Sequence, residues 1–463
     1  MTKAVAIYLF LLAFVLVAFV LIEHFRRKRD ILSMRNMAIV GFIIFQVTSA
    51  GLRLWTETYY PYRVSDPGGT GLQLAVWATI FAGVFLFVYK RGWFADWLAR
   101  KTPTTRARPS DAALILMSIV LAFGAAVLRT LDQYLHLLGI LAEMWGNGLA
   151  AVSAGLIGWV WAKRLFNPVM IALALGIVAF DMAVMMSDAF GRRGIVAVGG
   201  GLIWGMFYST WRTMGHGPML ARLALLSLPP ILFVALYTSV RSSEEHNRSA
   251  GQQVQAIKSA GNLKTGVYLL LDGQNTGATT LWAMEAYPER YAQRHLFTIK
   301  YYLVYIVPRS VWPSKPKPLS QLVASQADVP KVQQDKITLP AGILGNVAAE
   351  GGWYVLFIYA FVGAVFIRYF DRLIIGNVDS PIVVMSAASS LGQVIGLARG
   401  ETSAFAIHFT LTFVFTYGFL IVCSKAVERV MGARALPGYE EEKPDLAHEE
   451  YAAEYEDYAL DRS

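Results

Sequence analysis

Residues 4–22 read AVAIYLFLLAFVLVAFVLI, and a basic cluster, RRKR, follows at 26–29. A helix that crosses a bilayer needs roughly 20 predominantly apolar residues, so this run is long enough to span. Only Lys3 stands before the run, whereas a signal peptide carries its positive charge in front of the apolar region. The positive-inside rule therefore predicts a retained span whose amino end lies outside.

The composition of the whole chain agrees with a membrane protein. Hydrophobic residues make up 56% and charged residues 16% of the 463 residues, and the mean hydropathy is +0.45. These values are too apolar for an ordinary soluble domain. Further apolar runs lie at 37–55, 72–89, 112–131, 140–162, 169–187, 195–211, 223–240, 353–367, 382–398 and 403–423. Together the runs predict an all-α polytopic membrane protein with about 11 transmembrane helices.

The distribution of cations tests this topology. An odd number of spans puts the carboxyl end inside, and the basic loops at 90–108, 163–164 and 368–372 all fall where parity predicts the inner side. Two outer segments are also basic: the turn GRRG at 191–194 and the long segment 241–352. Long loops translocate largely regardless of charge. Topology thus explains the net charge of +9 without a nucleic-acid partner.

The chain divides into four regions. Residues 1–240 hold spans one to eight, 241–352 form an extracytoplasmic loop, and 353–424 hold spans nine to eleven. The tail 425–463 is polar and acidic, so we expect it to be disordered in the cytoplasm. Cys423 is the single cysteine, which excludes an intrachain disulfide and a multi-thiolate metal site.

The long loop carries two unusual segments. The run 296–307 is apolar but about half the length needed to cross, so we expect it to lie on the membrane surface or to dip in re-entrantly. The next segment reads PRSVWPSKPKP at 308–318. Its prolines favour a stiff, extended chain that displays Arg309 and Lys315. Such cations suit a phosphate-bearing lipid headgroup; the alternative is a Pro-rich lid that faces headgroups in general.

A resemblance rests on this region. PR at 308–309, WP at 312–313 and KP at 315–316 are followed by GILGN at 342–346 and by EGG at 350–352, which leads directly into an apolar run. This pattern resembles the signature region of bacterial oligosaccharide repeat-unit polymerases, the Wzy-type O-antigen and exopolysaccharide polymerases. The plan of many spans with one large loop toward the carboxyl end is similar over nearly the whole chain.

The resemblance implies a GT-C-like fold and a metal-independent enzyme without a cofactor. It implies transfer of a glycan from undecaprenyl pyrophosphate onto the non-reducing end of another lipid-linked repeat unit. The protein would be a multi-pass protein of the bacterial inner membrane with its active site facing the periplasm. Its partners would be undecaprenyl-pyrophosphate-linked oligosaccharide and membrane lipid, and a chain-length regulator is a further candidate.

Cations would then stabilise the departing pyrophosphate in place of a metal. The alternative for Arg192 and Arg193 is snorkelling at the membrane surface. The candidate pyrophosphate-binding residues are Arg192, Arg193, Arg309, Lys315 and Arg399.

An acid or base must take the proton of the acceptor hydroxyl. The candidates are Glu401, Glu350 and His408. Glu401 could instead pair with Arg399, and His408 could be a hydrogen-bonded core histidine. Asp181, inside a span, is a separate functional candidate, because an intramembrane carboxyl is costly. The histidines and carboxylates show no metal-ligand spacing.

Two other functions remain open. One is an O-antigen ligase or a GT-C glycosyltransferase that uses a lipid-phosphate sugar. The other is a flippase or transporter of lipid-linked glycan. Transporters usually show paired repeats and broken helices at matching positions, which this sequence does not display.

Overall fold

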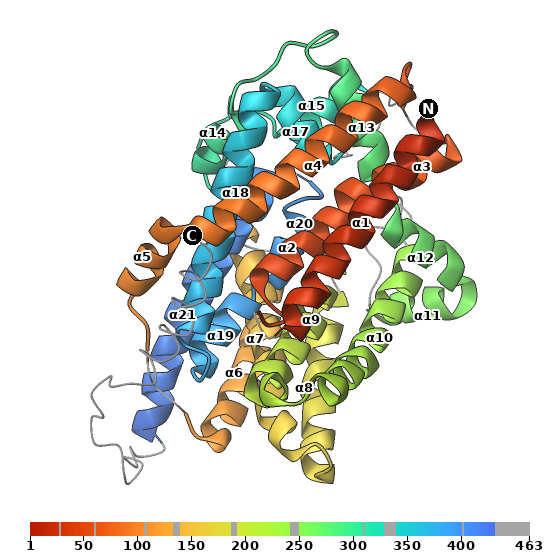
Figure 1. Ribbon diagram of the computed structural model, residues 1–463. Coiled ribbons are helices and arrows are strands. Elements are labelled where there is room, and N and C mark those ends of the chain that lie inside the picture. Colours follow the sequence, from red (N-terminus) through yellow and green to blue (C-terminus); the bar gives the residue numbers. More distant parts are fainter. Residues whose placement is uncertain are drawn as a thin grey trace.

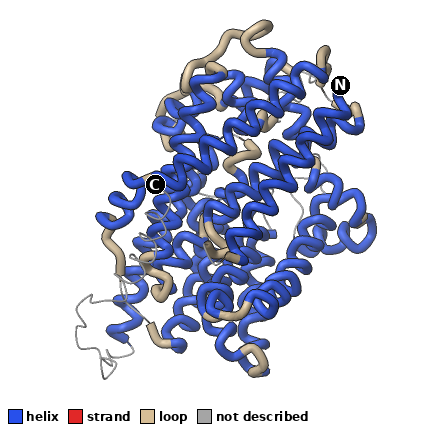
Figure 2. The backbone as a smooth tube through the Cα atoms, viewed as in Figure 1, coloured by secondary structure: helices blue, strands red, loops and turns tan. Residues whose placement is uncertain are grey.

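The computed structural model describes residues 1–26, 29–59, 62–105, 109–132, 139–186, 192–240, 250–307, 309, 311–327, 339–400 and 402–430. At 132, 139, 140, 192, 193, 250, 253, 274, 427, 428 and 430 it describes the backbone but not the side chain. Every regular element in these ranges is helical (Figure 2). The prediction of an all-α protein is confirmed.

Eight of the described helices are long and apolar enough to cross a membrane. They are α1 (Thr2–Phe25), the continuous helix Met34–Thr56, α4 (Pro67–Arg91), α6 (Asp111–Asp132), α8 (Pro168–Met186), α10 (His216–Val240), α18 (Trp353–Ile375) and α21 (Thr402–Val430). The polytopic membrane class is thereby confirmed. The other three predicted spans coincide with α7 (Gly139–Trp161), α9 (Arg192–Ser209) and the pair α19 (Pro381–Ala388) and α20 (Leu391–Gly396), which are shorter or less apolar. The count of about 11 therefore stays a prediction.

The helix Met34–Thr56 is not uniform. It consists of α2 (Met34–Phe42), a π-helical turn (Ile43–Thr48) and α3 (Ser49–Thr56). The amino end of this helix is held by Asp371 of α18. The Asp371 carboxylate accepts hydrogen bonds from the N–H groups of Met34 at 2.7 Å and Arg35 at 3.0 Å. A carboxylate at a helix amino end satisfies unpaired donors and complements the helix dipole.

Small residues let two central helices approach closely. A Cβ atom on Gly201 of α9 would lie only 2.2 Å from the carbonyl oxygen of Ala151 of α7. Ser118 and Ser153 join α6 to α7, since each hydroxyl donates to the other's carbonyl oxygen, at 2.8 and 2.9 Å. Between membrane helices, where lipid is as apolar as the side chains, such close packing and polar contacts stabilise association.

Ion pairs join the predicted inner loops and helix ends to one another. Helix α5 (Trp93–Lys101) lies in one of these loops, and its Asp96 forms an ion pair with Arg368 of α18. The pairs are Arg212 with Asp30, Lys163 with Asp111 and Arg368 with Asp96. We call this end of the bundle the inner end, following the positive-inside prediction, and the opposite end the outer end.

Short helices of the long segment cover the outer end. They are α11 (Ala250–Ala260), α12 (Leu263–Leu271), α13 (Thr276–Ala286), α14 (Phe297–Val304), α15 (Leu319–Gln326) and α17 (Gly342–Glu350). Figure 1 shows α13, α14, α15 and α17 gathered at the end where α1 begins, and α11 and α12 beside α10. Trp282, Leu319 and Val323 are buried in a small core of their own. We call α13, α14, α15 and α17 the outer cap.

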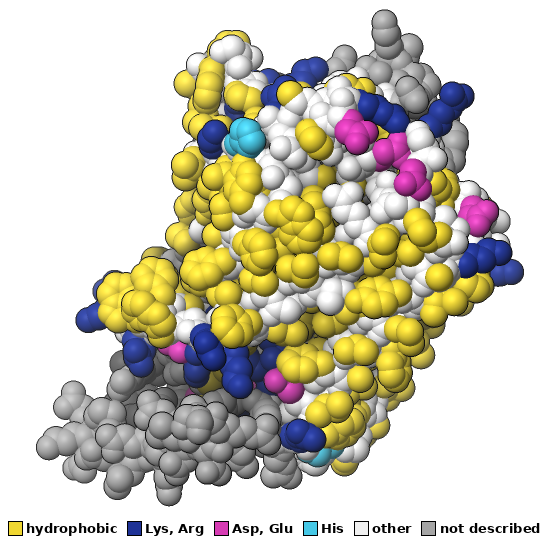
Figure 3. Space-filling model, turned by 45° about the horizontal axis from the view of Figure 1, so that its top comes forward, with side chains coloured by type: hydrophobic (Ala, Val, Ile, Leu, Met, Phe, Trp, Pro, Cys, Tyr) yellow, Lys and Arg dark blue, Asp and Glu magenta, His cyan; other side chains and the backbone are white. Residues whose placement is uncertain are grey.

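The surface agrees with a position in a bilayer. On the face drawn in Figure 3, hydrophobic side chains cover a broad middle zone, and Lys, Arg, Asp and Glu gather above and below it. A belt of this kind matches the hydrocarbon core of a membrane between two polar boundaries.

Candidate functional site

A stripe of polar side chains runs along the outer half of the helix Met34–Thr56. Gln46, Ser49 and Arg53 are spaced three and four residues apart, which places them on one face of a helix. All three are buried. Buried polar groups are costly unless they are hydrogen-bonded, and each of these reaches the outer cap or the turn next to it.

Gln46 connects two segments that the sequence analysis treated separately. Its Nε2 donates to the carbonyl oxygen of Ala398 at 2.8 Å, and its Oε1 accepts from the N–H of Leu344 at 3.2 Å. Gly342 makes room for this side chain, because it has φ +69° and a Cβ there would lie 1.9 Å from Gln46 Nε2. The amide therefore ties the start of α17 to the turn that carries Arg399.

Ser49 and Arg53 form hydrogen bonds with α13 and with the turn that precedes it. The Ser49 hydroxyl accepts from the N–H of Gly277 at 2.8 Å. Arg53 donates to both carboxylate oxygens of Asp272, at 2.6 and 2.7 Å, and also to the side chain of Asn275. A two-bond Arg–carboxylate pair fixes orientation as well as distance.

Asn346 completes the junction between α17 and the outer turn 398–402. Its Nδ2 donates to the carbonyl oxygen of Gly400 and to Thr402 Oγ1, both at 3.3 Å. Arg399 is half-buried in this turn, with its guanidinium carbon 6.0 Å from the centre of the Phe45 ring. Glu401 lies outside the described residues. The structure thus brings the GILGN segment and the Arg399 turn together.

Glu350 ends α17, one turn beyond Asn346, and its side chain is completely buried. Its carboxylate accepts from the N–H of Thr298 at 2.9 Å and from the hydroxyls of Thr298 and Tyr359. Burial raises the pKa of Glu350 above its ordinary value, and the donors of Thr298 and Tyr359 offset part of that rise. A raised pKa suits a general base that works near neutral pH. The same contacts also fasten the start of α14 to α17 and α18.

His408, Lys315 and Arg309 gather around the end of α14. The His408 Nε2 atom lies 3.1 Å from the hydroxyl of Tyr305. Lys315 is buried, and its Nζ donates to the carbonyl oxygens of Tyr305 at 2.6 Å and Val307 at 3.0 Å. These contacts favour the hydrogen-bonded reading of His408.

The Pro-rich segment displays only one of its two candidate cations, since Arg309 is exposed and Lys315 is buried. Arg309 donates to the carbonyl oxygens of Lys315 at 3.0 Å and Pro316 at 3.2 Å, within its own segment, whereas Lys315 binds carbonyl oxygens of the preceding run. Lys315 is drawn inward because the last carbonyl groups of a helix need donors from outside the helix, and a cation near the helix end is a good partner for them.

Three further predicted positions lie away from this junction or are described only in part. Arg192 and Arg193 begin α9, and their side chains are outside the described atoms. Asp181 of α8 is completely buried, and neither of its oxygens has a hydrogen-bond partner among the described residues.

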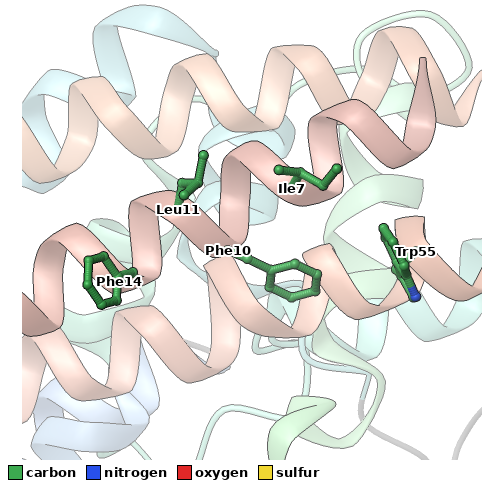
Figure 4. A pocket seen from close by; sticks show the side chains of 5 residues that line it. All are labelled: Ile7, Phe10, Leu11, Phe14 and Trp55. Atoms are coloured by element: carbon green, nitrogen blue, oxygen red, sulfur yellow. The ribbon is translucent and has the colours of Figure 1, made fainter.

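A shallow apolar groove of about 440 Å³ lies elsewhere on the surface. Figure 4 shows Ile7, Phe10, Leu11 and Phe14 on α1 and Trp55 on α3 around it. No candidate site residue lines the groove, and its side chains cannot perform acid or base chemistry. We read it as lipid-facing surface.

Among the described side chains, no three His, Cys, Asp or Glu residues lie together in a way that could hold a metal ion. The metal-independent reaction stays a prediction.

Sequence reasoning missed the polar stripe Gln46, Ser49 and Arg53 and its partner Asp272. A signal was present: Gln46 and Arg53 interrupt an apolar run at helical spacing, and a polar residue inside a span is expected to face the bundle interior and to be paired.

Comparisons of the chain with protein families, with curated proteins and with solved structures give no match. The polymerase family and the GT-C-like arrangement therefore stay predictions.

Proposed function

We propose that the protein is a lipid-linked oligosaccharide polymerase of the bacterial inner membrane, acting at its periplasmic side without a metal ion. The observation that carries the proposal is the junction of α17 with the turn 398–402. It places Asn346 against Gly400 at 3.3 Å, next to Arg399 and one helical turn from Glu350. A helix that carries an amide and a buried carboxylate is thus joined to a turn that carries a cation, at the outer end of the bundle.

In the proposed reaction, the acceptor hydroxyl attacks the anomeric carbon of a lipid-linked glycan. The bond from that carbon to pyrophosphate breaks, and its electron pair leaves with undecaprenyl pyrophosphate. Arg399, with Arg192 and Arg193, would bind the pyrophosphate, where a low-dielectric boundary strengthens charge interactions. Glu401 or Glu350 would accept the hydroxyl proton.

Arg309 and Lys315 have a different part in this proposal. Lys315 donates to carbonyl oxygens just after α14 and Arg309 to those of Lys315 and Pro316, so their part would be to shape the loop that follows α14. Arg399 carries the main pyrophosphate role among the described cations.

The test uses purified protein with undecaprenyl-pyrophosphate-linked repeat units. We expect elongation in excess EDTA, and we expect Glu401→Gln or Glu350→Gln to lower its rate by about 100-fold or more. Strict dependence on magnesium or manganese would overturn the cation-based mechanism. Transfer of the glycan to a lipid A core instead of another repeat unit would indicate the ligase.

One observation favours the transporter as a second candidate. The Asp181 carboxyl is completely buried in α8, and its oxygens lack a partner among the described residues. Intramembrane carboxyls of this kind often serve proton or ion pathways. Movement of intact lipid-linked glycan across proteoliposomes without elongation, and loss of that movement in Asp181→Asn, would support the transporter and refute the polymerase.

A further inference from the structure

The chain around the end of α14 exposes a group of large apolar side chains. Leu303 is 73% exposed, Ile306 48%, Val311 68% and Trp312 37%. We call these four residues the apolar rim. In water such a group would be an unfavourable surface, and contiguous exposed apolar side chains usually mark an interaction surface.

We propose that the apolar rim is inserted into the outer leaflet of the bilayer, where it contacts lipid acyl chains. This insertion does not depend on the proposed transfer reaction. It concerns how the outer cap is seated on the membrane.

The depth of the rim in the bilayer follows from the level at which α14 contacts the membrane helix α21. The apolar part of α21 runs from Ala404 to Cys423, roughly 20 residues, which matches the 30 Å hydrocarbon core. Ala404 therefore marks the outer boundary of the hydrocarbon core.

Two contacts with α21 give the depth of α14 and of Tyr305, which follows it, below this boundary. Tyr305 meets His408 at 3.1 Å, and the Tyr302 hydroxyl donates to Thr410 Oγ1 at 3.2 Å. His408 and Thr410 lie four and six residues inside the boundary, at depths of about 6 and 9 Å. Interfacial amphipathic segments bury their apolar face about 5–10 Å into the boundary between headgroups and acyl chains.

Two cations near the rim, Lys315 and Arg309, bind backbone carbonyl oxygens, and the exposed Lys300 and Lys317 have side chains long enough to reach the headgroups. Lys315 Nζ is held by the carbonyl oxygens of Tyr305 and Val307, and it lies 5.4 Å from the centre of the Tyr301 ring. Arg309 donates to two further carbonyl oxygens but stays exposed, so its guanidinium would lie at the level of the headgroups. Hydrogen bonds and aromatic faces lower the cost of taking a cation out of water.

Aromatic residues at the outer end of α18 extend the same boundary. Trp353 and Tyr354 begin α18 and are 48% and 43% exposed. Trp and Tyr concentrate at membrane–water boundaries. Trp312 on the rim would belong to the same belt.

The test is the immersion depth of spin labels on the full chain in liposomes, with Cys423→Ser as background. Leu303→Cys and Val311→Cys carry the label in turn. Phe361→Cys on the exposed side of α18 is the reference inside the bilayer, and Ser325→Cys on α15 is the matched control on the outer cap. We expect labels at 303 and 311 to collide more often with oxygen, which concentrates in lipid, than with a water-soluble nickel chelate. The label at 325 should show the reverse.

Nickel collisions at 303 and 311 that match those at 325 would overturn the proposal. As a second measurement, a fluorophore at the same two positions should be quenched by lipids brominated near the headgroup end of the acyl chain, and no quenching would equally refute it. Elongation activity plays no part in either readout. A negative result here therefore leaves the proposed function untouched, and a failed elongation assay leaves the insertion of the rim untouched.

Discussion

Arg53 and Asp272 form a buried two-bond ion pair between residues 219 positions apart in the chain, with Nε–Oδ1 and Nη2–Oδ2 distances of 2.6 and 2.7 Å. The pair joins the helix Met34–Thr56 to the turn that precedes α13 of the outer cap. Burial makes it a strong constraint, because loss of one partner leaves the other charge without compensation.

Arg53→Met should therefore lower the stability of the protein by about 3–5 kcal/mol, since the Asp272 carboxylate stays buried and unpaired. Thermal unfolding in detergent measures the effect. The double variant Arg53→Met with Asp272→Leu removes both charges and should recover much of the loss.

Lys163→Met is the matched control for that experiment. Lys163 pairs with Asp111 at 2.9 Å, but the two side chains are 40% and 26% exposed. An exposed pair of this type contributes about 0–1 kcal/mol. Equal losses for Arg53→Met and Lys163→Met would contradict the role assigned to burial.

The pH dependence of stability should report on Glu350. Its pKa is raised in the folded protein by burial, so folding favours the protonated carboxyl. The stabilising contribution is present in full below the unfolded pKa, about 4.3, and is lost as pH rises through the higher folded pKa. The unfolding temperature of the wild type should therefore fall as pH rises from the unfolded pKa to the folded pKa of Glu350. In Glu350→Gln this part of the fall should be absent.

Tyr359→Phe provides the complementary variant. It removes one donor to the Glu350 carboxylate and should raise the folded pKa further, since that hydrogen bond favours the charged form. The fall in unfolding temperature should then shift to higher pH. An identical pH profile for the wild type and both variants would exclude a titrating Glu350.

Arg399 and Arg309 should separate activity from structure. Arg399→Ala should reduce elongation by roughly 10²–10³-fold, the usual effect of removing one group that stabilises developing charge, with little change in unfolding temperature. Arg399→Lys should recover part of the rate, because lysine keeps the charge but lacks the two-bond fork.

Arg309→Ala should behave differently, because its guanidinium binds two backbone carbonyl oxygens. We expect a loss of stability of about 0.5–1.5 kcal/mol, the net contribution of a hydrogen bond that water can partly replace, because Arg309 is exposed, measured by unfolding in detergent. Unchanged elongation by Arg399→Ala would remove the proposed pyrophosphate site.

Cysteine labelling in intact cells tests the topology. In a Cys423→Ser background, Ser259→Cys should react with an impermeant thiol reagent, because 241–352 is predicted outside. Phe166→Cys, at an exposed position in a predicted inner loop, should be protected until the membrane is opened. Equal labelling of both variants would refute the assignment of sides.

The sequence predicted the eight long apolar helices well, because the length and apolarity that a bilayer requires are local properties of the chain. Asn346 and Glu350 are four residues apart, a spacing that puts them on one face if the segment is helical, and both lie on the helix α17. The meeting of α17 with the turn at Ala398 could not be predicted, because it depends on Gln46, and hydropathy does not specify which loop a polar side chain will reach.

The Pro-rich segment shows a second limit. Its prolines suggested displayed cations, but Lys315 is buried against carbonyl oxygens of Tyr305 and Val307. Proline fixes the backbone angle φ and says little about where a neighbouring side chain finds an acceptor. That acceptor exists only once α14 has ended where it does.

The π-helical turn Ile43–Thr48 has a consequence for variation in chain length. A π-helical turn accommodates one residue more than an α-helical turn. Deletion of Ile43 would convert the π-helical turn to α-helix. The contacts of Met34 with Asp371 and of Arg53 with Asp272 would then both be kept. The same deletion at Ala38 would turn Met34 away from its anchor by about 100° relative to Arg53. Insertions and deletions among natural variants of this helix should therefore concentrate at this turn.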